Sequence, residues 1–308
     1  GERSSAGATA MIDFFYTYQS VLDHVLVYSL LAMSQYIVMR AGTFSVGTAA
    51  FAAIGAYSTA ILATRLGWPP VAAIGTSVLL ATVLSALMAT PLSRLRGVFQ
   101  AVATMALVQV VVTINLNWED VTRGALGISG IPKVATTEWL LLIVVLVVVL
   151  LQIMGRFSIG RAMDVIREDE TVAVSLGINV TQQQRIAMTI SGFLAGLGGA
   201  LYACNSYAIT PGEFGFNLLT AALAMAVLGG RKSVWGAIIG AVVLTILPEL
   251  FRVFADYRNV VQGVLLMGVI IYLPDGIADT LFALAHDRRV KRNLSSSAGV
   301  SATREAAQ

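Results

Sequence analysis

The sequence predicts an all-α polytopic membrane protein with about nine transmembrane helices, and eight to ten crossings fit its pattern. Composition is the first observation behind this fold class, because 57% of the 308 residues are hydrophobic and only 12% are charged. A soluble domain usually carries roughly 25% charged residues. The mean hydropathy of +0.79 points the same way. Lipid must therefore be the solvent for much of the exterior.

Long apolar segments are the second observation, because a helix needs about 20 mostly apolar residues to cross a bilayer. Nine segments meet or approach this length: 22–39, 46–64, 71–91, 98–116, 139–155, 186–204, 216–230, 234–251 and 260–275. The stretch 42–60 is rich in Gly, Ala, Ser and Thr. This composition fits either a continuous span or a broken or re-entrant helix.

The distribution of basic residues is the third observation, since cytoplasmic loops carry an excess of Lys and Arg. If loop 156–185 is cytoplasmic and the spans alternate, 14 of the 20 Lys and Arg residues lie inside: Arg40, Arg94, Arg96, Arg156, Arg161, Arg167, Arg185, Arg231, Lys232, Arg288, Arg289, Lys291, Arg292 and Arg304. The other six lie outside: Arg3, Arg65, Arg123, Lys133, Arg252 and Arg258. We therefore expect loop 156–185 and the C terminus in the cytoplasm and the N terminus outside. The dispersed charges do not suggest nucleic-acid binding.

Residues that could carry covalent or metal chemistry are few and scattered. Cys204 is the single cysteine, and His24 and His286 lie near opposite ends of the chain. These residues predict neither a disulfide, nor a metal site, nor a catalytic set. The stretch "GGRKS" has Arg231 where a phosphate-binding loop needs Gly, so we expect no nucleotide site in this chain.

A charged stretch, "GRAMDVIREDETVAVSLGIN" (160–179), interrupts the apolar pattern. Val172 and Leu176 fall at helical spacing, while Arg167 and Glu168 lie on the opposite side, so the stretch predicts an amphipathic helix over 160–176. Gly177 is placed to end that helix in a left-handed conformation. The residues alone leave two interpretations open, a solvated interfacial helix or an element that docks a soluble partner.

The charged stretch resembles the cytoplasmic loop of the branched-chain amino acid ABC transporter permease family, whose pattern is close to G-R-A-x-x-x-I-R-E-D-E-x-x-A-x-x-L-G-I-N. The chain departs from that pattern at Asp164, where a basic residue is usual. Seven further segments agree in order: "GTFSVGTAAFAAIGAY", "RLRGVFQAVATMAL", "TRGALGISGIP", "LAGLGGALYA", "AVLGGRKSVWGAIIGA", "LPELFR" and "YLPDGI". "RLRGVFQAVATMAL" and "TRGALGISGIP" resemble the LivM type of the family. The resemblance covers about residues 22–278.

The resemblance implies that the loop is a coupling helix seated in a groove of a cytoplasmic ATPase. The residues that it assigns to coupling are Gly160, Arg161, Arg167, Glu168, Asp169, Glu170, Leu176 and Gly177. The charged members could form charge-assisted hydrogen bonds with a polar partner, and Leu176 could enter an apolar pocket.

The resemblance also implies an assembly in the bacterial inner membrane. Its partners would be a LivH-type permease, two ABC ATPase subunits that bind the ATP, and an extracytoplasmic solute-binding protein. No cofactor is expected in this chain. The chain would then divide into an N-terminal segment (1–21), a transmembrane permease domain (22–278) and a polar cytoplasmic tail (279–308) expected to be disordered.

A substrate pathway is expected near the Gly-rich segment, at Gly42, Ser45, Gly47 and Gly55, and at Gln109. If the helix breaks there, free backbone N–H groups at the start of a half-helix could meet a substrate carboxylate. For Gln109 the alternative is a structural hydrogen bond with a neighbouring helix.

The sequence leaves alternatives for the transported solute and for the class of transporter. The family's usual cargo is leucine, isoleucine and valine, and its relatives carry urea, short amides or aromatic and other carboxylates. A different class, an ion-coupled secondary transporter, would need an acidic relay in the membrane. Glu249 is the one acidic residue near such a position, and Arg252 is placed to pair with it.

Overall fold

The computed structural model describes residues 2–133, 135–230, 233–250, 263 and 267, and the side chains within 19–133, 135–230 and 233–246. Its order is α1 (Glu2–Arg40), α2 (Thr48–Thr64), α3 (Pro70–Leu92), α4 (Val98–Asn117), α5 (Glu119–Thr122), η1 (Gly124–Leu126), β1 (Ile128–Ser129), α6 (Thr137–Arg156), α7 (Ser158–Glu168), α8 (Glu170–Ser175), α9 (Val180–Ser206), β2 (Ala208–Ile209), η2 (Pro211–Phe214), α10 (Phe216–Gly229) and α11 (Val234–Leu250). The all-α class is confirmed.

Six helices are long and apolar enough to cross a membrane: Gln19–Arg40, Pro70–Leu92, Val98–Asn117, Thr137–Arg156, Val180–Ser206 and Pro211–Gly229. Thr48–Thr64 and Val234–Ile246 are shorter apolar helices. Eight of the nine predicted segments thus coincide with apolar helices of a polytopic membrane protein. The ninth segment, 260–275, lies outside the described residues except at positions 263 and 267. Arg252 and the tail 279–308 also lie outside them, and the side chain of Glu249 is not described.

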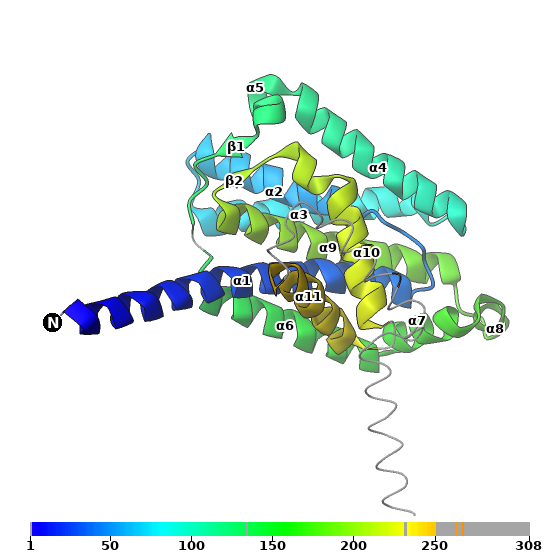
Figure 1. Cartoon of the computed structure of the whole chain (residues 1–308). Coiled ribbons are helices and arrows are strands. Elements are labelled where there is room, and N and C mark those ends of the chain that lie inside the picture. The colour runs from blue at the N-terminus through cyan, green and yellow to red at the C-terminus, as the bar shows by residue number, and fades with distance from the viewer. Residues whose placement is uncertain (1, 134, 231–232, 251–262, 264–266, 268–308) are drawn as a thin grey trace, which may run out of the picture.

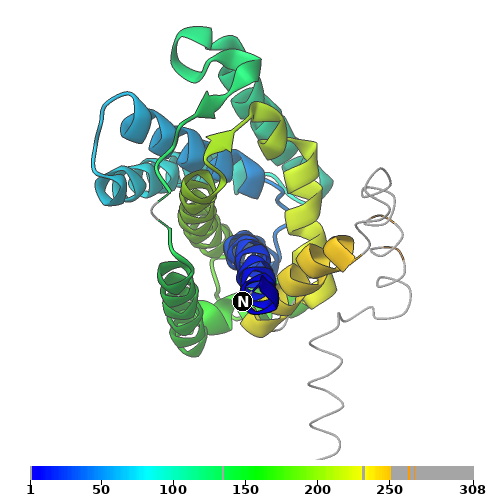
Figure 2. The ribbon, with the colours of Figure 1, turned by 60° about the vertical axis from the view of Figure 1, so that its left-hand side comes forward.

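Helix α9 lies at the centre of the bundle, between α1, α2 and α3 (Figures 1 and 2). The most apolar windows of α1 and α9 are each 67% buried, against 28% for α3 and α6 and 22% for α4. The bundle therefore has a protein-surrounded centre, and α3, α4 and α6 form its periphery.

Small residues set the spacing around α9. A Cβ on Gly199 would overlap the carbonyl oxygen of Ala52 in α2, and one on Gly192 would overlap the side chain of Ser85 in α3. Gly196 lies between both neighbouring helices. Gly55 of α2 lies against the Gly196 carbonyl, and Ala81 of α3 lies against the Gly196 Cα. The G-x-x-x-G pattern of α9 therefore serves packing within this chain.

The predicted Gly-rich segment is broken at one place. Helix α1 ends at Arg40, the backbone of 41–47 leaves the helical conformation, and Gly42 adopts a left-handed φ of 68°. Helix α2 then runs without a break from Thr48 to Thr64. The break thus precedes α2, which is itself largely buried.

Polar connections gather at two ends of the bundle (Figure 1). One end holds α5, η1, η2 and the antiparallel pair β1–β2, in which Ile128 pairs with Ile209. The other end holds α7 and α8 together with the C-terminal ends of α1, α3 and α6. The described basic residues of the predicted inside set all lie at this second end: Arg40, Arg94, Arg96, Arg156, Arg161, Arg167 and Arg185.

Replacing Gly199 by Ala should destabilise the bundle by about 2 kcal/mol, because the added methyl group pushes α9 away from the Ala52 carbonyl. The matched control is Gly75→Ala in α3, where a Cβ would meet nothing within 4 Å. The control gains helix propensity and should be neutral or stabilising. Thermal unfolding of the detergent-solubilised variants measures both effects. Equal stability of the two variants would show that the contact between α2 and α9 is not close-packed.

Candidate functional site

The charged stretch forms two helices where the sequence predicted one. Helix α7 ends at Glu168, Asp169 has extended backbone angles (φ −156°, ψ 118°), and α8 begins at Glu170. The Asp169 carboxylate accepts hydrogen bonds from the backbone N–H groups of Thr171 (2.7 Å) and Val172 (3.2 Å). The expectation of a continuous helix over 160–176 is therefore wrong, because Asp at a helix N-cap competes successfully with helix continuation.

The N-cap also fixes the charge of Asp169. Hydrogen bonds from Val172 and Thr171 hold the pKa of this carboxyl below its ordinary value of 3.8. Since the folded pKa is the lower one, the stabilisation is present above the ordinary pKa and is lost as the pH falls through the folded value. Asp169 is therefore an anion, and α8 is capped, throughout the neutral range.

The end of α8 matches the prediction from the sequence. Gly177 adopts a φ of 79°, and the N–H of Ile178 donates to the carbonyl of Ala173 (3.0 Å). The side chain of Asn179 then accepts from the N–H of Gln182 (3.1 Å) and caps α9. A left-handed turn and an Asn cap thus join α8 directly to the central helix α9.

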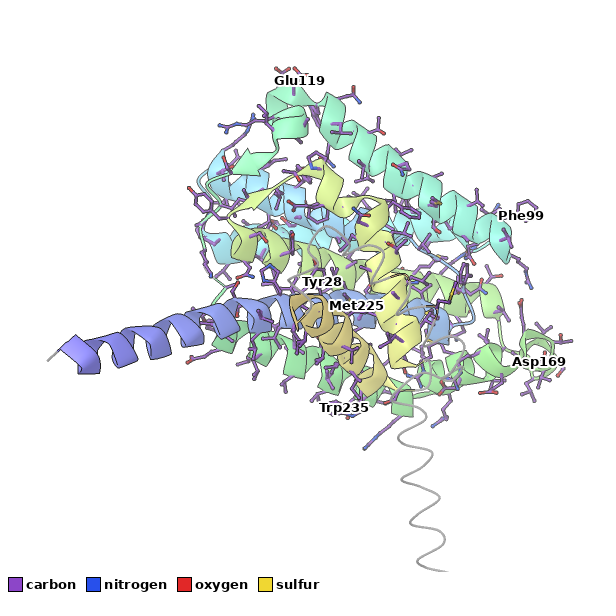
Figure 3. All side chains as sticks on the ribbon, in the orientation of Figure 1. Tyr28, Phe99, Glu119, Asp169, Met225 and Trp235 are labelled. Atoms are coloured by element: carbon purple, nitrogen blue, oxygen red, sulfur yellow. The ribbon has the colours of Figure 1, made fainter. Side chains whose placement is uncertain are left out.

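The surface of α7 and α8 combines acidic and apolar side chains. Ile166 and Ala173 are buried with Val180. We define the docking surface as the exposed residues Glu168, Val172, Val174 and Leu176 together with the half-buried Glu170, which forms an ion pair with Arg96. Leu176 is 66% exposed, and Asp169 marks this end of the molecule in Figure 3. Such an exposed apolar residue beside carboxylates is suited to an apolar pocket with a polar rim.

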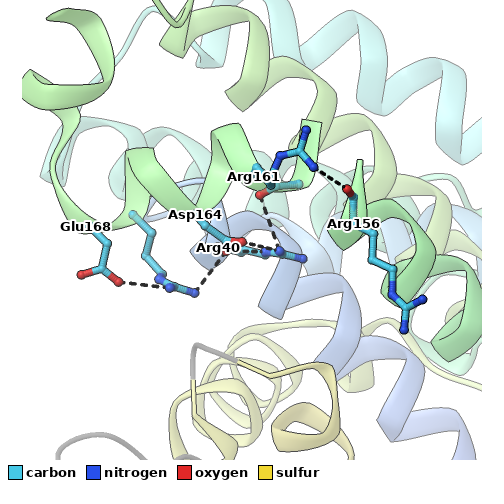
Figure 4. A network of polar contacts seen from close by, with 7 residues as sticks. Arg40, Arg156, Arg161, Asp164 and Glu168 are labelled. Atoms are coloured by element: carbon cyan, nitrogen blue, oxygen red, sulfur yellow. Dashed lines mark hydrogen bonds and ion pairs between the residues drawn. The ribbon is translucent and has the colours of Figure 1, made fainter. Parts of the chain in front are cut away.

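An ion pair between α1 and α7 attaches this surface to the bundle (Figure 4). Arg40 Nε donates to Asp164 Oδ1 at 2.8 Å, and Arg40 Nη2 donates to Asp164 Oδ2 at 2.6 Å. Arg167 lies 3.4 Å from the same carboxylate and 3.1 Å from Glu168 Oε1. The Arg40 side chain is only 8% exposed. This bidentate geometry is the strong form of an arginine–carboxylate contact.

Two glycines allow close approach near this pair, Gly155 to the Arg40 side chain and Gly160 to the end of α6. A Cβ on Gly155 would lie 3.1 Å from Arg40 Nη1, and one on Gly160 would lie 2.5 Å from the carbonyl oxygen of Met154. Gly160 therefore lets α7 turn back closely on the end of α6. The predicted coupling residue Arg161 is exposed and donates to the Arg156 carbonyl at 2.9 Å.

The sequence analysis marked Asp164 as a departure from the family pattern and did not identify its partner. The available signal was Arg40, a lone cation at the end of an apolar span. Asp164 is an acid where a base is usual, and Arg40 is a base at the end of a span. Together the two residues indicate a charge-complementary pair.

The predicted pathway residues do not converge. Gly42 packs against Ile166 of α7, and Gly55 packs against Gly196 of α9. Ser45 and Gly47 border a small cavity of about 10 Å³. Gln109 is exposed on α4.

Several backbone N–H groups in the break between α1 and α2 already have partners. The N–H of Val46 donates to Thr104 Oγ1 (3.1 Å), and the N–H of Gly47 donates to Ser45 Oγ (3.4 Å). Gln35 donates to the Ser45 carbonyl at 2.7 Å and accepts from Thr48 Oγ1 at 2.7 Å. In this conformation the break is a hydrogen-bonded junction between α1, α2 and α4.

Breaking the Arg40–Asp164 pair should separate α7 from α1. A double-mutant cycle with Arg40→Gln and Asp164→Asn should give a coupling free energy of about 1 kcal/mol, allowing for the partial exposure of Asp164. The control cycle uses the exposed pair Arg96–Glu170, with Arg96→Gln and Glu170→Gln, where we expect less than about 0.5 kcal/mol. Thermal unfolding of the seven proteins, with the wild type common to the two cycles, gives both values. A coupling no larger than the control would contradict a structural link.

Removing the carboxylate of Asp169 should open α8. We expect Asp169→Ala to speed hydrogen exchange at the amides of Thr171 and Val172 by about threefold or more, because the cap is lost. Asp169→Asn retains an acceptor oxygen and serves as the control, with near wild-type exchange. Mass spectrometry of a peptide spanning 168–178 provides the measurement. Unchanged exchange in Asp169→Ala would show that the cap does not hold α8.

Comparison with known proteins places the chain in a family. A family model described as "Branched-chain amino acid transport system / permease component" matches residues 18–271. The high-affinity branched-chain amino acid transport system permease protein LivM of Salmonella typhimurium is 30% identical, over 82% of this chain and 68% of the relative. LivM of Escherichia coli K12 is 29% identical over the same shares.

A second type of relative matches a shorter part of the chain. The permease protein LivH of Escherichia coli K12 is 34% identical over 41% of this chain and 42% of its own length. No solved structure matches. The family model covers most of the chain, and the similarity to LivM extends over most of both sequences. The chain therefore belongs to the branched-chain amino acid transport system permease family.

Proposed function

We propose that this chain is the permease subunit of an ATP-driven ABC importer and forms half of a translocation pathway. The observation that carries the proposal is the two-helix element α7–α8, which is attached on one side by the Arg40–Asp164 pair and leads on the other through Gly177 into α9. The element thus touches both of the most buried spanning helices, α1 and α9. A partner that moves α7 and α8 would pull directly on the centre of the bundle.

The chemistry of the docking surface supports a soluble protein partner. Glu168 and Glu170 offer carboxylates, while Leu176 offers an exposed apolar side chain. A lipid-facing surface would not carry these acids, and a purely solvated one would not expose so many apolar side chains. The partner proposed is a cytoplasmic ABC ATPase that presents basic residues around an apolar pocket. Two such subunits would bind the ATP.

The orientation follows from charge. The end of the bundle with α7 and α8 carries seven described Lys or Arg residues, and such an excess is typical of the cytoplasmic side. The opposite end, with β1, β2 and the acidic helix α5, would then face outward and receive the solute-binding protein. This arrangement is proposed for a bacterial inner membrane, with a LivH-type permease forming the other half of the pathway.

The proposed cargo is a branched-chain or related amino acid, because the relatives LivM and LivH carry that description. Urea, short amides and aromatic or other carboxylates remain alternatives within the same class. Specificity would reside mainly with the binding protein that delivers the solute.

Charge reversal at Glu168 and Glu170 should uncouple the assembly. Glu168→Lys with Glu170→Lys replaces both acids that would meet a basic partner, so we expect ATPase binding to weaken at least tenfold and solute-stimulated ATP hydrolysis to be lost. The binding of purified ATPase to reconstituted permease provides the first measurement, and the hydrolysis rate provides the second.

The control for this experiment reverses two exposed acids at the opposite end, Glu119→Lys with Asp120→Lys, and should leave ATPase binding unchanged. Normal ATPase binding and normal stimulated hydrolysis in the Glu168/Glu170 variant would remove the docking role. Weakened binding in both double variants would indicate a general folding defect, which thermal unfolding measures independently.

A further inference from the structure

Helix α4 lies at the edge of the bundle; in Figure 3 Phe99 marks its first turn, and Glu119 of α5 lies just beyond its other end. Its buried residues lie on one side: Gln100, Thr104, Val108, Val111, Val112 and Asn115. Thr104 on this side accepts the N–H of Val46. Only 22% of the most apolar window of α4 is buried, so the described part of the chain leaves most of its surface uncovered.

The opposite side of α4 carries a polar stripe, defined as Gln109, Thr113 and Asn117. All three are exposed, and their spacing of four residues places them on one face. Gln109 lies about 17 Å from the start of the helix and about 12 Å from its end, at 1.5 Å per residue. In a helix about 30 Å long, Gln109 therefore lies near the middle of the membrane.

Helix α4 also exposes apolar residues near its centre, among them Met105 and Val110, but the two other peripheral helices differ from it in their polar residues. The central exposed surface of α6 is formed by Leu142, Val145, Leu146 and Val149. Exposed threonines of α3 satisfy their hydroxyl groups within the helix, as Thr76 does with the Ala72 carbonyl (2.8 Å). Gln109 and Thr113 have no side-chain hydrogen bond to another described residue. Asn117 donates to the Thr113 carbonyl at 2.8 Å and keeps its amide oxygen for another donor.

Lipid does not suit this stripe. An amide or hydroxyl group in hydrocarbon without a hydrogen bond loses the free energy of its hydration, and polar side chains within spans usually face a protein interior or a water-filled cavity. In α4 the side toward the protein interior is already occupied by the buried residues. None of the described residues covers the polar stripe, which is suited to water or to polar groups of another subunit.

We propose that the polar stripe of α4 lines the water-filled translocation path, and that the path is completed by a second membrane subunit facing α4. This inference rests on the proposed importer function and names the surface that the solute passes. An amide and a hydroxyl group can each donate and accept a hydrogen bond. The stripe carries no fixed charge, so it suits a polar or zwitterionic solute that must bind weakly and leave again.

Cysteine labelling in the full assembly tests the assignment. Cys204 is fully buried, so the background reaction is low. Gln109→Cys and Thr113→Cys are compared with Leu146→Cys, which lies at a similar depth on the exposed apolar surface of α6 and is 53% exposed in the native residue. The reagent is the charged, water-soluble methanethiosulfonate ethyltrimethylammonium, applied in vesicles of both orientations, with and without ATP.

We expect the thiol at 109 or 113 to react at least tenfold faster than the thiol at 146 in at least one of these states, because the attacking nucleophile is the thiolate, which forms where the thiol is hydrated. Thr113→Cys changes the side chain least and keeps the test valid if Gln109→Cys fails to assemble. Reaction as slow as Leu146→Cys at both positions in every state would overturn the proposal, because α4 would then face lipid or a dry interface.

A failed labelling test would leave the importer function intact, since ATPase binding is measured separately through Glu168 and Glu170. Conversely, fast labelling at 109 or 113 in a permease that binds no ATPase would support a water-filled path while removing the proposed coupling. The two ideas can therefore fail independently.

Discussion

Close contact between backbones around α9 is the constraint on which the rest of the structure depends. Without a hydrophobic force between helices in lipid, packing and interhelical hydrogen bonds must hold the bundle. Glycines of α9 let α2 and α3 approach until there is no room for a Cβ. Hydroxyl groups then add to this packing, because Ser34 of α1 donates to the Ser191 carbonyl (2.9 Å) and Ser85 of α3 donates to the Met188 carbonyl (2.7 Å).

This rigid centre explains why a short polar element at one end can matter to the whole molecule. Helix α7 is attached to α1 through Arg40 and Asp164, and α8 leads into α9 through the turn at Gly177. Helices α1 and α9 are packed against each other with hydrogen bonds between them, so α7 and α8 are attached to one connected pair of helices. In the proposed coupling, displacement of α7 and α8 would move α1 and α9 together.

The sequence alone predicted the fold class, eight apolar helices and the position of the charged loop, because these depend on composition and period. It also predicted the left-handed end at Gly177, which depends on one local property of glycine. The break at Asp169 was missed because the helical spacing of apolar residues continues on both sides of it. The Asp169 side chain ends one helix and caps the next, and periodicity does not report such a local cap. The Arg40–Asp164 pair was missed because a contact across 124 positions has no periodic signal.

The pathway was the hardest feature to predict, for a physical reason. Gly, Ser and Thr in a span serve close packing as well as solute passage, and composition does not separate the two uses. In the structure Gly55 meets Gly196, and Ser45 and Gly47 belong to a hydrogen-bonded junction. Gln109 differs from them because it is exposed while the packed side of its helix is already filled. Exposure of a polar side chain at mid-membrane depth, which only the three-dimensional arrangement reveals, is therefore the property on which the proposed path rests, because exposed apolar residues at that depth, such as Leu146, suit lipid.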